Sequence, residues 1–151
     1  MSIRIGIVGY GNLGRGVESA IGQNPDMELH AVYTRRPPES LRIHSAGVPV
    51  LPMEELEKAS GPDVLVLCGG SATDLPLQTP ALAQRYHLVD SFDTHADIPE
   101  HFARVDAAAK ASGHVALISA GWDPGLFSLS RLYMSAALPQ GQDYTLSLIH
   151  I

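Results

Sequence analysis

Short runs of apolar residues alternate along the chain with segments in which apolar residues recur every three or four positions. The short runs predict buried strands at residues 3–8, 27–34, 48–51, 63–68, 87–90 and 114–119. The segments with helical spacing predict helices at residues 12–23, 52–59, 74–86, 97–112 and 124–138. Residues 35–47 are polar and contain prolines, so we expect a loop there.

Alternation of strands and helices at this spacing is typical of parallel sheets that are covered by helices on both faces. The right-handed rule for crossover connections then favours a doubly wound order of strands. We therefore predict an α/β fold, a doubly wound parallel sheet of Rossmann type. In such a fold, ligands bind outside the carboxyl ends of the strands.

The predicted helix at residues 97–112 has the clearest boundaries. Asp97 is placed to cap it, Glu100 follows three residues later, and Gly113 ends it. The apolar positions of this helix predict its inner face, which consists of Ile98, Phe102, Val105 and Ala109.

The composition argues against several classes of protein. The chain has 151 residues, of which 45% are apolar and 17% charged, as in globular rather than disordered proteins. Its net charge of -6 offers no attraction to nucleic acid or to an anionic membrane. No apolar run approaches the roughly 20 residues of a membrane helix, and no signal peptide is visible. We therefore predict a cytoplasmic location.

The single cysteine and the seven histidines predict neither a disulfide nor a metal site. We expect Cys68 to be a small buried side chain. No two histidines have the i, i+4 spacing of a helical metal site, and we expect His95 and His101 to be solvated. No serine lies in a G-x-S-x-G elbow, which argues against a Ser-His-Asp hydrolase.

A glycine motif follows the first predicted strand and opens the first predicted helix. Its residues are Gly9, Tyr10, Gly11, Asn12, Leu13 and Gly14. In this context the motif is the fingerprint of a dinucleotide-binding turn. Gly9 permits a tight turn, Gly11 lets the backbone approach a pyrophosphate, and Gly14 lets the helix pack close to the strand. The amides and the dipole of the helix start favour the phosphate charge.

The end of the second predicted strand indicates which dinucleotide binds. An NAD enzyme usually has an Asp or Glu about 20 residues after the glycine motif, where it binds the ribose 2′-hydroxyl. Here the residues are Thr34, Arg35 and Arg36. A guanidinium group binds a 2′-phosphate with two charge-assisted hydrogen bonds, so we predict NADP rather than NAD.

Small residues follow the predicted strand at residues 63–68. They are Cys68, Gly69, Gly70, Ser71, Ala72 and Thr73. Side chains of this size let the backbone approach the nicotinamide ribose, which Ser71 and Thr73 can bind through hydrogen bonds. Capping of the next helix is an equally good interpretation of Thr73.

Two further strand ends, at residues 90–95 and 119–125, carry carboxylates beside an aromatic residue. Asp93 and Asp123 can hold a substrate ammonium group, and Trp122 can exclude water. The structural alternatives are an Asx turn at Asp93 and an Asp123 cap on a helix that begins at Pro124. From the same two segments, we expect the cofactor to contact Ser91, Phe92, Ala120, Gly121 and Pro124.

Four segments together resemble the meso-diaminopimelate dehydrogenase family: residues 7–15, 70–74, 90–93 and 119–125. The resemblance runs from about Ile3 to Thr145, and its most specific part is the Gly-Trp-Asp-Pro-Gly stretch with the aspartate loop. It implies homodimeric enzymes of lysine biosynthesis. They use NADP to deaminate the D-centre of meso-2,6-diaminopimelate oxidatively, which gives L-2-amino-6-oxopimelate and ammonia.

The same resemblance implies roles for individual residues. Asp93, Trp122 and Asp123 match positions that contact the substrate around its reacting centre. The positions that match cofactor contacts are Tyr10, Asn12, Leu13, Thr34, Arg35 and Arg36, with Ser71, Ala72 and Thr73 beside them.

The resemblance ends before residues 146–151, which do not match the family. We therefore expect an NADP-binding Rossmann domain at residues 1–122 and the start of a truncated substrate and dimerisation domain at residues 123–145. We expect residues 146–151 to be a non-native tail. Because the family recognises the distal L-centre with the region that follows, we do not expect this chain to turn over substrate alone.

Two other kinds of function remain open on the sequence. One is a different Rossmann oxidoreductase, such as another amino-acid dehydrogenase or a relative of dihydrodipicolinate reductase. The other is a non-catalytic NADP-sensing module. Asp93 and Asp123 argue against a sensor, because a sensor needs no carboxylates beside the nicotinamide.

Overall fold

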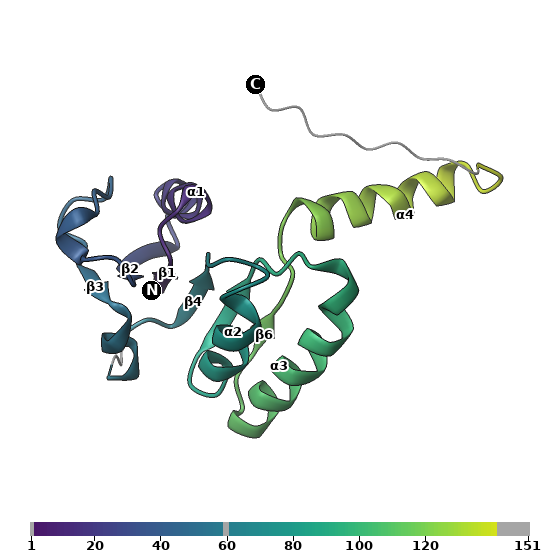
Figure 1. The fold of residues 1–151 in the computed structure, drawn as a ribbon. Coiled ribbons are helices and arrows are strands. Elements are labelled where there is room, and N and C mark those ends of the chain that lie inside the picture. Colours follow the sequence, from purple (N-terminus) through teal and green to yellow (C-terminus); the bar gives the residue numbers. More distant parts are fainter. Residues whose placement is uncertain (1, 59–60, 142–151) are drawn as a thin grey trace.

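The computed structural model describes residues 2–58 and 61–141. Within these residues one parallel sheet has the strand order β3-β2-β1-β4-β5-β6 (Figure 1). Its strands are β1 (Ile3–Val8), β2 (Met27–Thr34), β3 (Val50–Pro52), β4 (Val64–Leu67), β5 (His87–Asp90) and β6 (Ala116–Leu117). This order is typical of dinucleotide-binding sheets, and it confirms the predicted doubly wound α/β fold.

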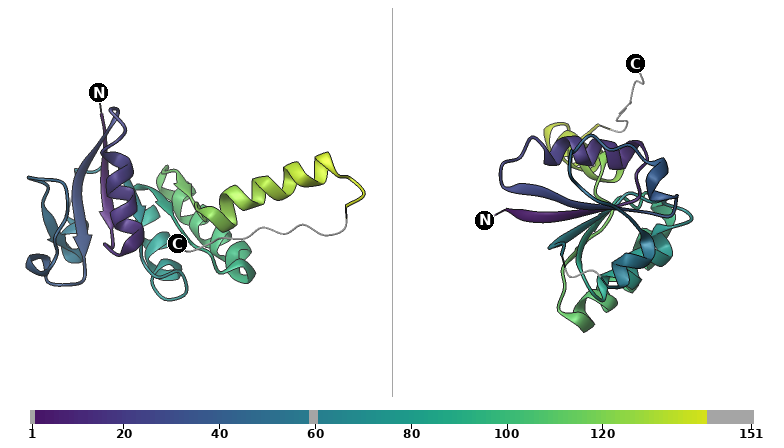
Figure 2. Two further views of the ribbon diagram at one scale, coloured as in Figure 1. Left: turned by 90° about the horizontal axis from the view of Figure 1, so that it is seen from above. Right: turned by 90° about the vertical axis from the view of Figure 1, so that its left-hand side faces the viewer.

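Helices cover both faces of the sheet, as the end-on view in Figure 2 shows. The helices are α1 (Asn12–Ile21), α2 (Leu75–Ala83), α3 (Ile98–Ser112) and α4 (Phe127–Ala137). Shorter helical turns are η1 (Pro38–Ser40), η2 (Met53–Glu57), η3 (His95–Asp97) and η4 (Trp122–Leu126). None of the helices in the described ranges combines the length and the apolar character that crossing a bilayer requires.

Two apolar clusters, one on each face, hold the sheet to its helices. Successive side chains of a strand point to opposite faces, so Ile7 joins one cluster and Val8 the other. Ile21 of α1 packs with Ile7, whereas Leu75 of α2 and Val105 of α3 pack with Val8. The strands are buried by helices from both sides, which explains why they are almost continuously apolar in sequence.

The structure confirms one end of the predicted helix at residues 97–112 and corrects the other. Gly113 ends α3 in the left-handed conformation, with a φ of 73°. Asp97 precedes the helix but makes no capping hydrogen bond with its side chain. The predicted inner face is also partly wrong, because Phe102 is 56% exposed. Its place is taken by His101, which lies four residues before Val105 on the buried face.

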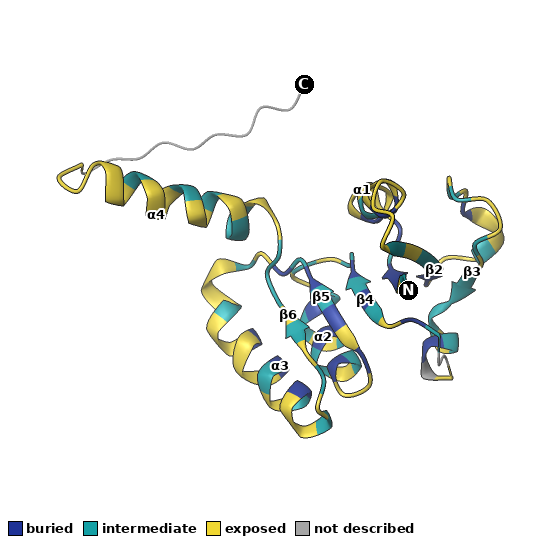
Figure 3. Cartoon of the chain, turned by 180° about the vertical axis from the view of Figure 1, so that it is seen from behind, coloured by how far each residue is buried: buried dark blue, intermediate teal, exposed yellow. Residues whose placement is uncertain are grey.

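The last helix begins later than the sequence predicts. We expected it to start at Pro124, but residues Asp123, Pro124 and Gly125 have non-helical backbone angles and α4 begins at Phe127. No residue of α4 is buried, and Figures 1 and 3 show the helix extending away from the sheet. Residues 142–145 of the expected second domain and the expected tail at 146–151 lie outside the described residues.

Candidate functional site

A cleft of about 580 Å³ lies at the carboxyl edge of the sheet. It is lined by Gly11, Asn12, Leu13, Cys68, Gly69, Gly70, Ser71, Ser91, Phe92, Asp93, Ser119, Ala120, Gly121, Trp122, Asp123 and Pro124. These residues follow β1, β4, β5 and β6, so the fold brings together all four segments that end these strands. The remaining predicted site residues do not line the cleft: Gly9, Tyr10, Gly14, Thr34, Arg35, Arg36, Ala72 and Thr73.

The glycine turn has the geometry that the sequence predicts. Gly9 has a φ of 90°, and a Cβ atom there would lie 3.2 Å from the carbonyl of Cys68. A Cβ atom on Gly14 would lie 2.5 Å from the carbonyl oxygen of Gly9, so any side chain would force α1 away from the turn. A Cβ atom on Gly11 would meet nothing within 4 Å, because this residue faces the open cleft.

The start of α1 fits a phosphate group. Gly11 occupies the cap position and makes no capping hydrogen bond with a side chain. The first amides of the helix therefore have no side-chain acceptor among the described residues, and they carry the positive end of the helix dipole. An anion in the cleft beside Gly11 would accept hydrogen bonds from these amides.

The side chain of Tyr10 points into the core rather than into the cleft. It is 2% exposed, and its hydroxyl donates a hydrogen bond to the carboxylate of Glu18. Burial, reinforced by Glu18, raises the pKa of Tyr10 to about 12. Any cofactor contact of Tyr10 is therefore a contact of its backbone.

Glu18 fastens the loop that follows the arginine pair. Its carboxylate accepts hydrogen bonds from the backbone N–H groups of His44 and Ser45, at 2.9 and 2.6 Å. Burial alone would raise the pKa of Glu18, but the hydrogen bonds from Tyr10, Ser45 and His44 lower it below its usual range. The contact between Glu18 and the loop could not be predicted from the sequence, because the helical pattern treats Glu18 as one more polar residue of an amphipathic helix.

Arg35 and Arg36 are held by different parts of the site. The guanidinium of Arg35 forms a paired salt bridge with Asp74 at 2.8 and 2.7 Å. Arg36 donates to the carbonyl of Tyr10, and its backbone N–H donates to Thr34 Oγ1 at 3.0 Å. Each guanidinium has five N–H donors, so each keeps donors for a phosphate.

Asp74 joins the arginine side of the cleft to the segment after β4. It accepts a hydrogen bond from the Gly70 N–H at 2.9 Å in addition to the salt bridge with Arg35. The Gly70 hydrogen bond and then Arg35 lower the pKa of Asp74 against the effect of its burial. Asp74, rather than Thr73, occupies the cap position of α2, so the capping interpretation of Thr73 is wrong.

The segment after β4 contacts the segment after β5. Ser71 Oγ accepts a hydrogen bond from the Asp93 N–H at 2.8 Å and lies 3.3 Å from Thr94 Oγ1. Ser71 thus fixes the backbone from which the exposed carboxylate of Asp93 extends.

Cys68 is a small side chain but only partly buried, because it also lines the cleft, so the prediction of a buried cysteine holds only in part. It packs against the cluster around Ile7, and burial raises the pKa of its thiol to about 12. The nucleophilic thiolate is therefore almost absent at neutral pH.

We expect the folded chain to be nearly inert to thiol reagents. At pH 8, Cys68 should react with iodoacetamide roughly a thousandfold more slowly than in the unfolded chain, because its thiolate fraction is that much smaller. Mass spectrometry of the labelled chain measures the rate, and labelling in guanidinium chloride is the control. Equal rates in the two conditions would contradict a raised pKa of the Cys68 thiol.

On the far side of the cleft, Asp123 binds α4. Its two oxygens accept hydrogen bonds from Arg131 at 2.9 and 2.7 Å, and His95 Nε2 lies 3.9 Å from one of them. Arg131 is the main cause of the lowered pKa of Asp123. The structural alternative of a helix cap at Asp123 is wrong, because its carboxylate pairs with a side chain and α4 begins four residues later.

Trp122 stands beside Asp123 on the wall of the cleft. It is 59% exposed and meets Phe127 edge-on, with the ring centres 6.0 Å apart. A large aromatic ring at this place can limit the access of water to the cleft.

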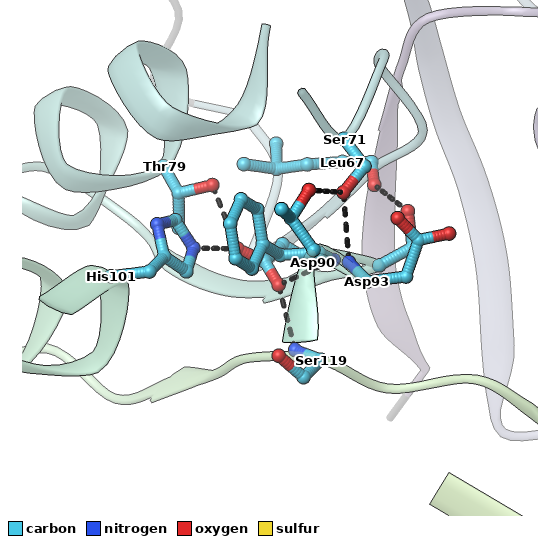
Figure 4. Close-up of polar contacts among 10 residues, drawn as sticks. Leu67, Ser71, Thr79, Asp90, Asp93, His101 and Ser119 are labelled. Carbon is cyan, nitrogen blue, oxygen red and sulfur yellow. Dashed lines mark hydrogen bonds and ion pairs between the residues drawn. The ribbon is translucent and has the colours of Figure 1, made fainter. Parts of the chain in front are cut away.

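A buried carboxylate beneath the cleft escapes the sequence analysis. Asp90 ends β5, is fully buried, and has His101 Nε2 at 2.6 Å from its Oδ2 atom (Figure 4). The prediction that His101 is solvated is wrong, because it is 3% exposed. Phe92 is buried as well and stacks on His101, with ring centres 4.1 Å apart. Any cofactor contact of Phe92 would therefore be made by its backbone.

A signal for this pair is present in the sequence. His101 lies on the same helical face as Val105 and Ala109, which are apolar. A histidine on such a face needs a buried partner, and Asp90 stands at the end of a buried strand. Within residues 2–58 and 61–141, no group of three or more His, Cys, Asp or Glu side chains forms a candidate metal site.

Comparisons with known proteins agree with this geometry. No protein-family model matches the chain. Its fold superimposes on the DAP dehydrogenase of Corynebacterium glutamicum in complex with DAP, with a TM-score of 0.79 and 47% identity over 90% of this chain and 41% of that one. An engineered D-amino acid dehydrogenase bound to NADP⁺ gives a TM-score of 0.75 and 45% identity over 91% of this chain and 42% of that one.

The strand order, the glycine turn and the cleft define a Rossmann-type domain with the dinucleotide-binding fingerprint. Over 144 residues the chain is 60% identical to the meso-diaminopimelate D-dehydrogenase of Ureibacillus thermosphaericus, an alignment that covers 95% of this chain. The chain belongs to the meso-diaminopimelate D-dehydrogenase family. It spans about 44% of the length of the curated relatives it matches.

Proposed function

We propose that the chain carries the NADP site and part of the substrate site of a meso-diaminopimelate dehydrogenase. The complete enzyme oxidises the D-centre of meso-2,6-diaminopimelate with NADP⁺ and water, which gives L-2-amino-6-oxopimelate, ammonia, NADPH and a proton. We further propose that it is a homodimer of the cytoplasm that serves lysine biosynthesis. Residues 123–145 begin its second domain in this proposal.

One observation supports this proposal above the others: a single cleft joins the glycine turn to two carboxylates. At one end, the uncapped start of α1 and the arginines that flank it fit the phosphates of NADP. At the other end, Asp93 and Asp123 offer negative charge to an ammonium group. Of the similar structures, the engineered D-amino acid dehydrogenase is bound to NADP⁺ and the Corynebacterium glutamicum DAP dehydrogenase is in complex with DAP.

Residues at different places along the cleft have different roles in this proposal. NADP⁺ held at the glycine turn and the start of α1 would supply the hydride acceptor. Asp93 and Asp123 orient the amino group of the D-centre, and the lowered pKa of Asp123 keeps it ionised for this role. Trp122 restricts water until the imine that remains on the substrate is hydrolysed.

The proposal is tested first by titrating the purified chain with NADPH and with NADH, following the fluorescence of each nucleotide. We expect NADPH to bind at least about tenfold more tightly, because a 2′-phosphate adds charge-assisted hydrogen bonds. Equal affinities would contradict the NADP assignment. Binding of neither nucleotide would contradict the site itself.

Turnover is tested in a chimera, in which residues 1–141 of this chain replace the matching segment of the Ureibacillus thermosphaericus relative. Asp123→Ala should lower kcat/KM for meso-diaminopimelate by roughly 10- to 150-fold and leave NADPH affinity unchanged. Asp106→Ala is the control, because Asp106 pairs with Lys110 on α3, away from the cleft. Equal losses of NADPH affinity and turnover in Asp123→Ala would contradict a substrate role.

A further inference from the structure

The buried carboxylate of Asp90 touches four separate parts of the chain (Figure 4). Its Oδ2 atom accepts hydrogen bonds from Thr79 Oγ1 of α2 at 2.8 Å and faces His101 Nε2 of α3 at 2.6 Å. Its Oδ1 atom accepts the backbone N–H of Phe92 at 3.1 Å and that of Ser119 at 2.8 Å. One oxygen is thus held by the helices, and the other holds two loops.

Both loops lead directly into the substrate side of the cleft. Phe92 is followed by Asp93, and Ser119 is followed by the segment that carries Trp122 and Asp123. The backbone oxygen of Asp90 adds a second tie to this segment by accepting the Ala120 N–H at 2.9 Å. The two aspartates and the tryptophan therefore share one anchor.

The backbone conformation of the loop after β6 is not one that its own residues favour. Ser119 has a φ of 59°, in a region that residues other than glycine seldom occupy. Its hydroxyl is buried without a hydrogen-bond partner among the described residues. Contacts from outside must compensate for both costs, and the N–H bond to Asp90 is one such contact.

The contacts of His101 allow it to hold the carboxylate of Asp90 in place. Its Nδ1 atom is buried without a partner in the described part of the chain, so the hydrogen bond that fixes the ring is the one between Nε2 and Asp90. Phe92 constrains the face of the same ring, because the two rings stack with their centres 4.1 Å apart. A buried polar pair of this kind is costly unless its geometry is satisfied, and it accepts little variation in position.

We propose that Asp90, held by His101 and Thr79, is a positioning residue that sets both substrate-side loops against the nicotinamide end of the cleft. The inference rests on the proposed function, because the loops it aligns carry the proposed substrate contacts. Asp90 itself lies beneath the cleft and touches neither substrate nor cofactor. Its effect reaches the reaction through Asp93, Trp122 and Asp123.

Trp122 is the only tryptophan of the chain and reports the position of its loop. We would compare the wild type with Asp90→Asn, which keeps the shape but offers only one acceptor oxygen, and with Asp90→Ala. Two quantities are measured: the dissociation constant of NADPH, and energy transfer from Trp122 to bound NADPH. We expect transfer to fall in Asp90→Asn and further in Asp90→Ala, while affinity, set at the arginine end, changes less than about threefold.

Val105→Ala is the matched control, because Val105 is a buried residue one turn along α3 from His101. It should lower the melting temperature while leaving transfer unchanged, which separates positioning from general stability. A fall in transfer that merely follows the melting temperature across all variants would overturn the inference. Unchanged transfer in folded Asp90→Asn and Asp90→Ala would overturn it too.

Amide hydrogen exchange without nucleotide gives a second test and needs no cofactor. In Asp90→Asn, protection of the Phe92 and Ser119 amides should fall by about tenfold or more, because the carboxylate that holds them is replaced by an amide with a single acceptor oxygen. Protection in β1 should stay unchanged. If the wild type binds no NADPH, the proposed function fails, and this measurement alone decides whether Asp90 holds the loops. Unchanged protection would overturn the inference.

Discussion

Removing both arginines that follow β2 is expected to abolish the preference for NADPH over NADH. Arg35 is anchored to Asp74 and Arg36 to the Tyr10 carbonyl, so both guanidinium groups are already held near the glycine turn and the segment after β4. A charged hydrogen bond contributes about 1.5–3 kcal/mol. Losing two such groups should weaken NADPH binding by roughly a hundredfold or more and leave NADH binding unchanged.

The adenosine end can be tested separately from the nicotinamide end. Calorimetric titration with 2′,5′-ADP and with 5′-AMP isolates the 2′-phosphate. Arg42→Ala is the matched control, because Arg42 is an exposed arginine of the same loop, and it tests for a general effect of lost positive charge. If Arg42→Ala costs as much as the double variant, the effect is long-range attraction and the arginine pair is no specific site.

The two arginines should differ in a way that the salt bridge explains. Arg35→Ala removes a phosphate donor and also leaves the carboxylate of Asp74 without its partner near the phosphate. That variant should therefore bind 2′,5′-ADP less well than Arg36→Ala. Adding Asp74→Asn to Arg35→Ala should restore part of the loss, since it removes the repulsion.

Much of the fold could be predicted because the strands of a covered parallel sheet are almost continuously apolar. The strands β1, β2 and β5 have the predicted limits, since a glycine, an arginine or an aspartate interrupts each apolar run. Helix starts were less predictable. Pro124 is a common first residue of a helix, yet Gly125 with a φ of 134° delays α4 to Phe127.

The cleft could be predicted from a backbone rule, whereas its side-chain pairs could not. The carboxyl ends of parallel strands meet at one edge, which brings Asp93 and Asp123 to the same cleft whatever their neighbours are. The pairs of Arg35 with Asp74, and of Asp123 with Arg131, depend on which side chains the tertiary packing leaves within reach. Sequence spacing carries no information on these distances.

His101 illustrates the same limit inside the core. Histidine is usually at least partly exposed, so the residue type alone predicts a solvated side chain at position 101. The stripe of Val105 and Ala109 places position 101 on the buried face, and Asp90 makes its burial tolerable. Whether a polar residue such as His101 is buried thus depends on its partner as well as on its own position. A prediction made from position 101 alone therefore gives the wrong environment.

Replacing Gly14 by alanine is expected to disrupt the nucleotide turn, although alanine is the better helix former. The added Cβ atom would lie 2.5 Å from the carbonyl oxygen of Gly9, and a backbone atom cannot rotate away as a side chain would. Either α1 or the turn must shift, at a cost of about 1–3 kcal/mol. The shift moves the uncapped amides of α1 relative to Gly9–Gly11, so we expect NADPH affinity to fall by at least about tenfold.

Gly16 provides the control within the same helix. It is exposed, and a Cβ atom there would meet nothing within 4 Å. Gly16→Ala should therefore stabilise the fold by about 0.5–1 kcal/mol through helix propensity alone and leave NADPH affinity unchanged. Circular dichroism melts and nucleotide titrations of both variants measure the contrast. If Gly14→Ala also melts higher and binds NADPH normally, the close approach of α1 to the turn is not what the site requires.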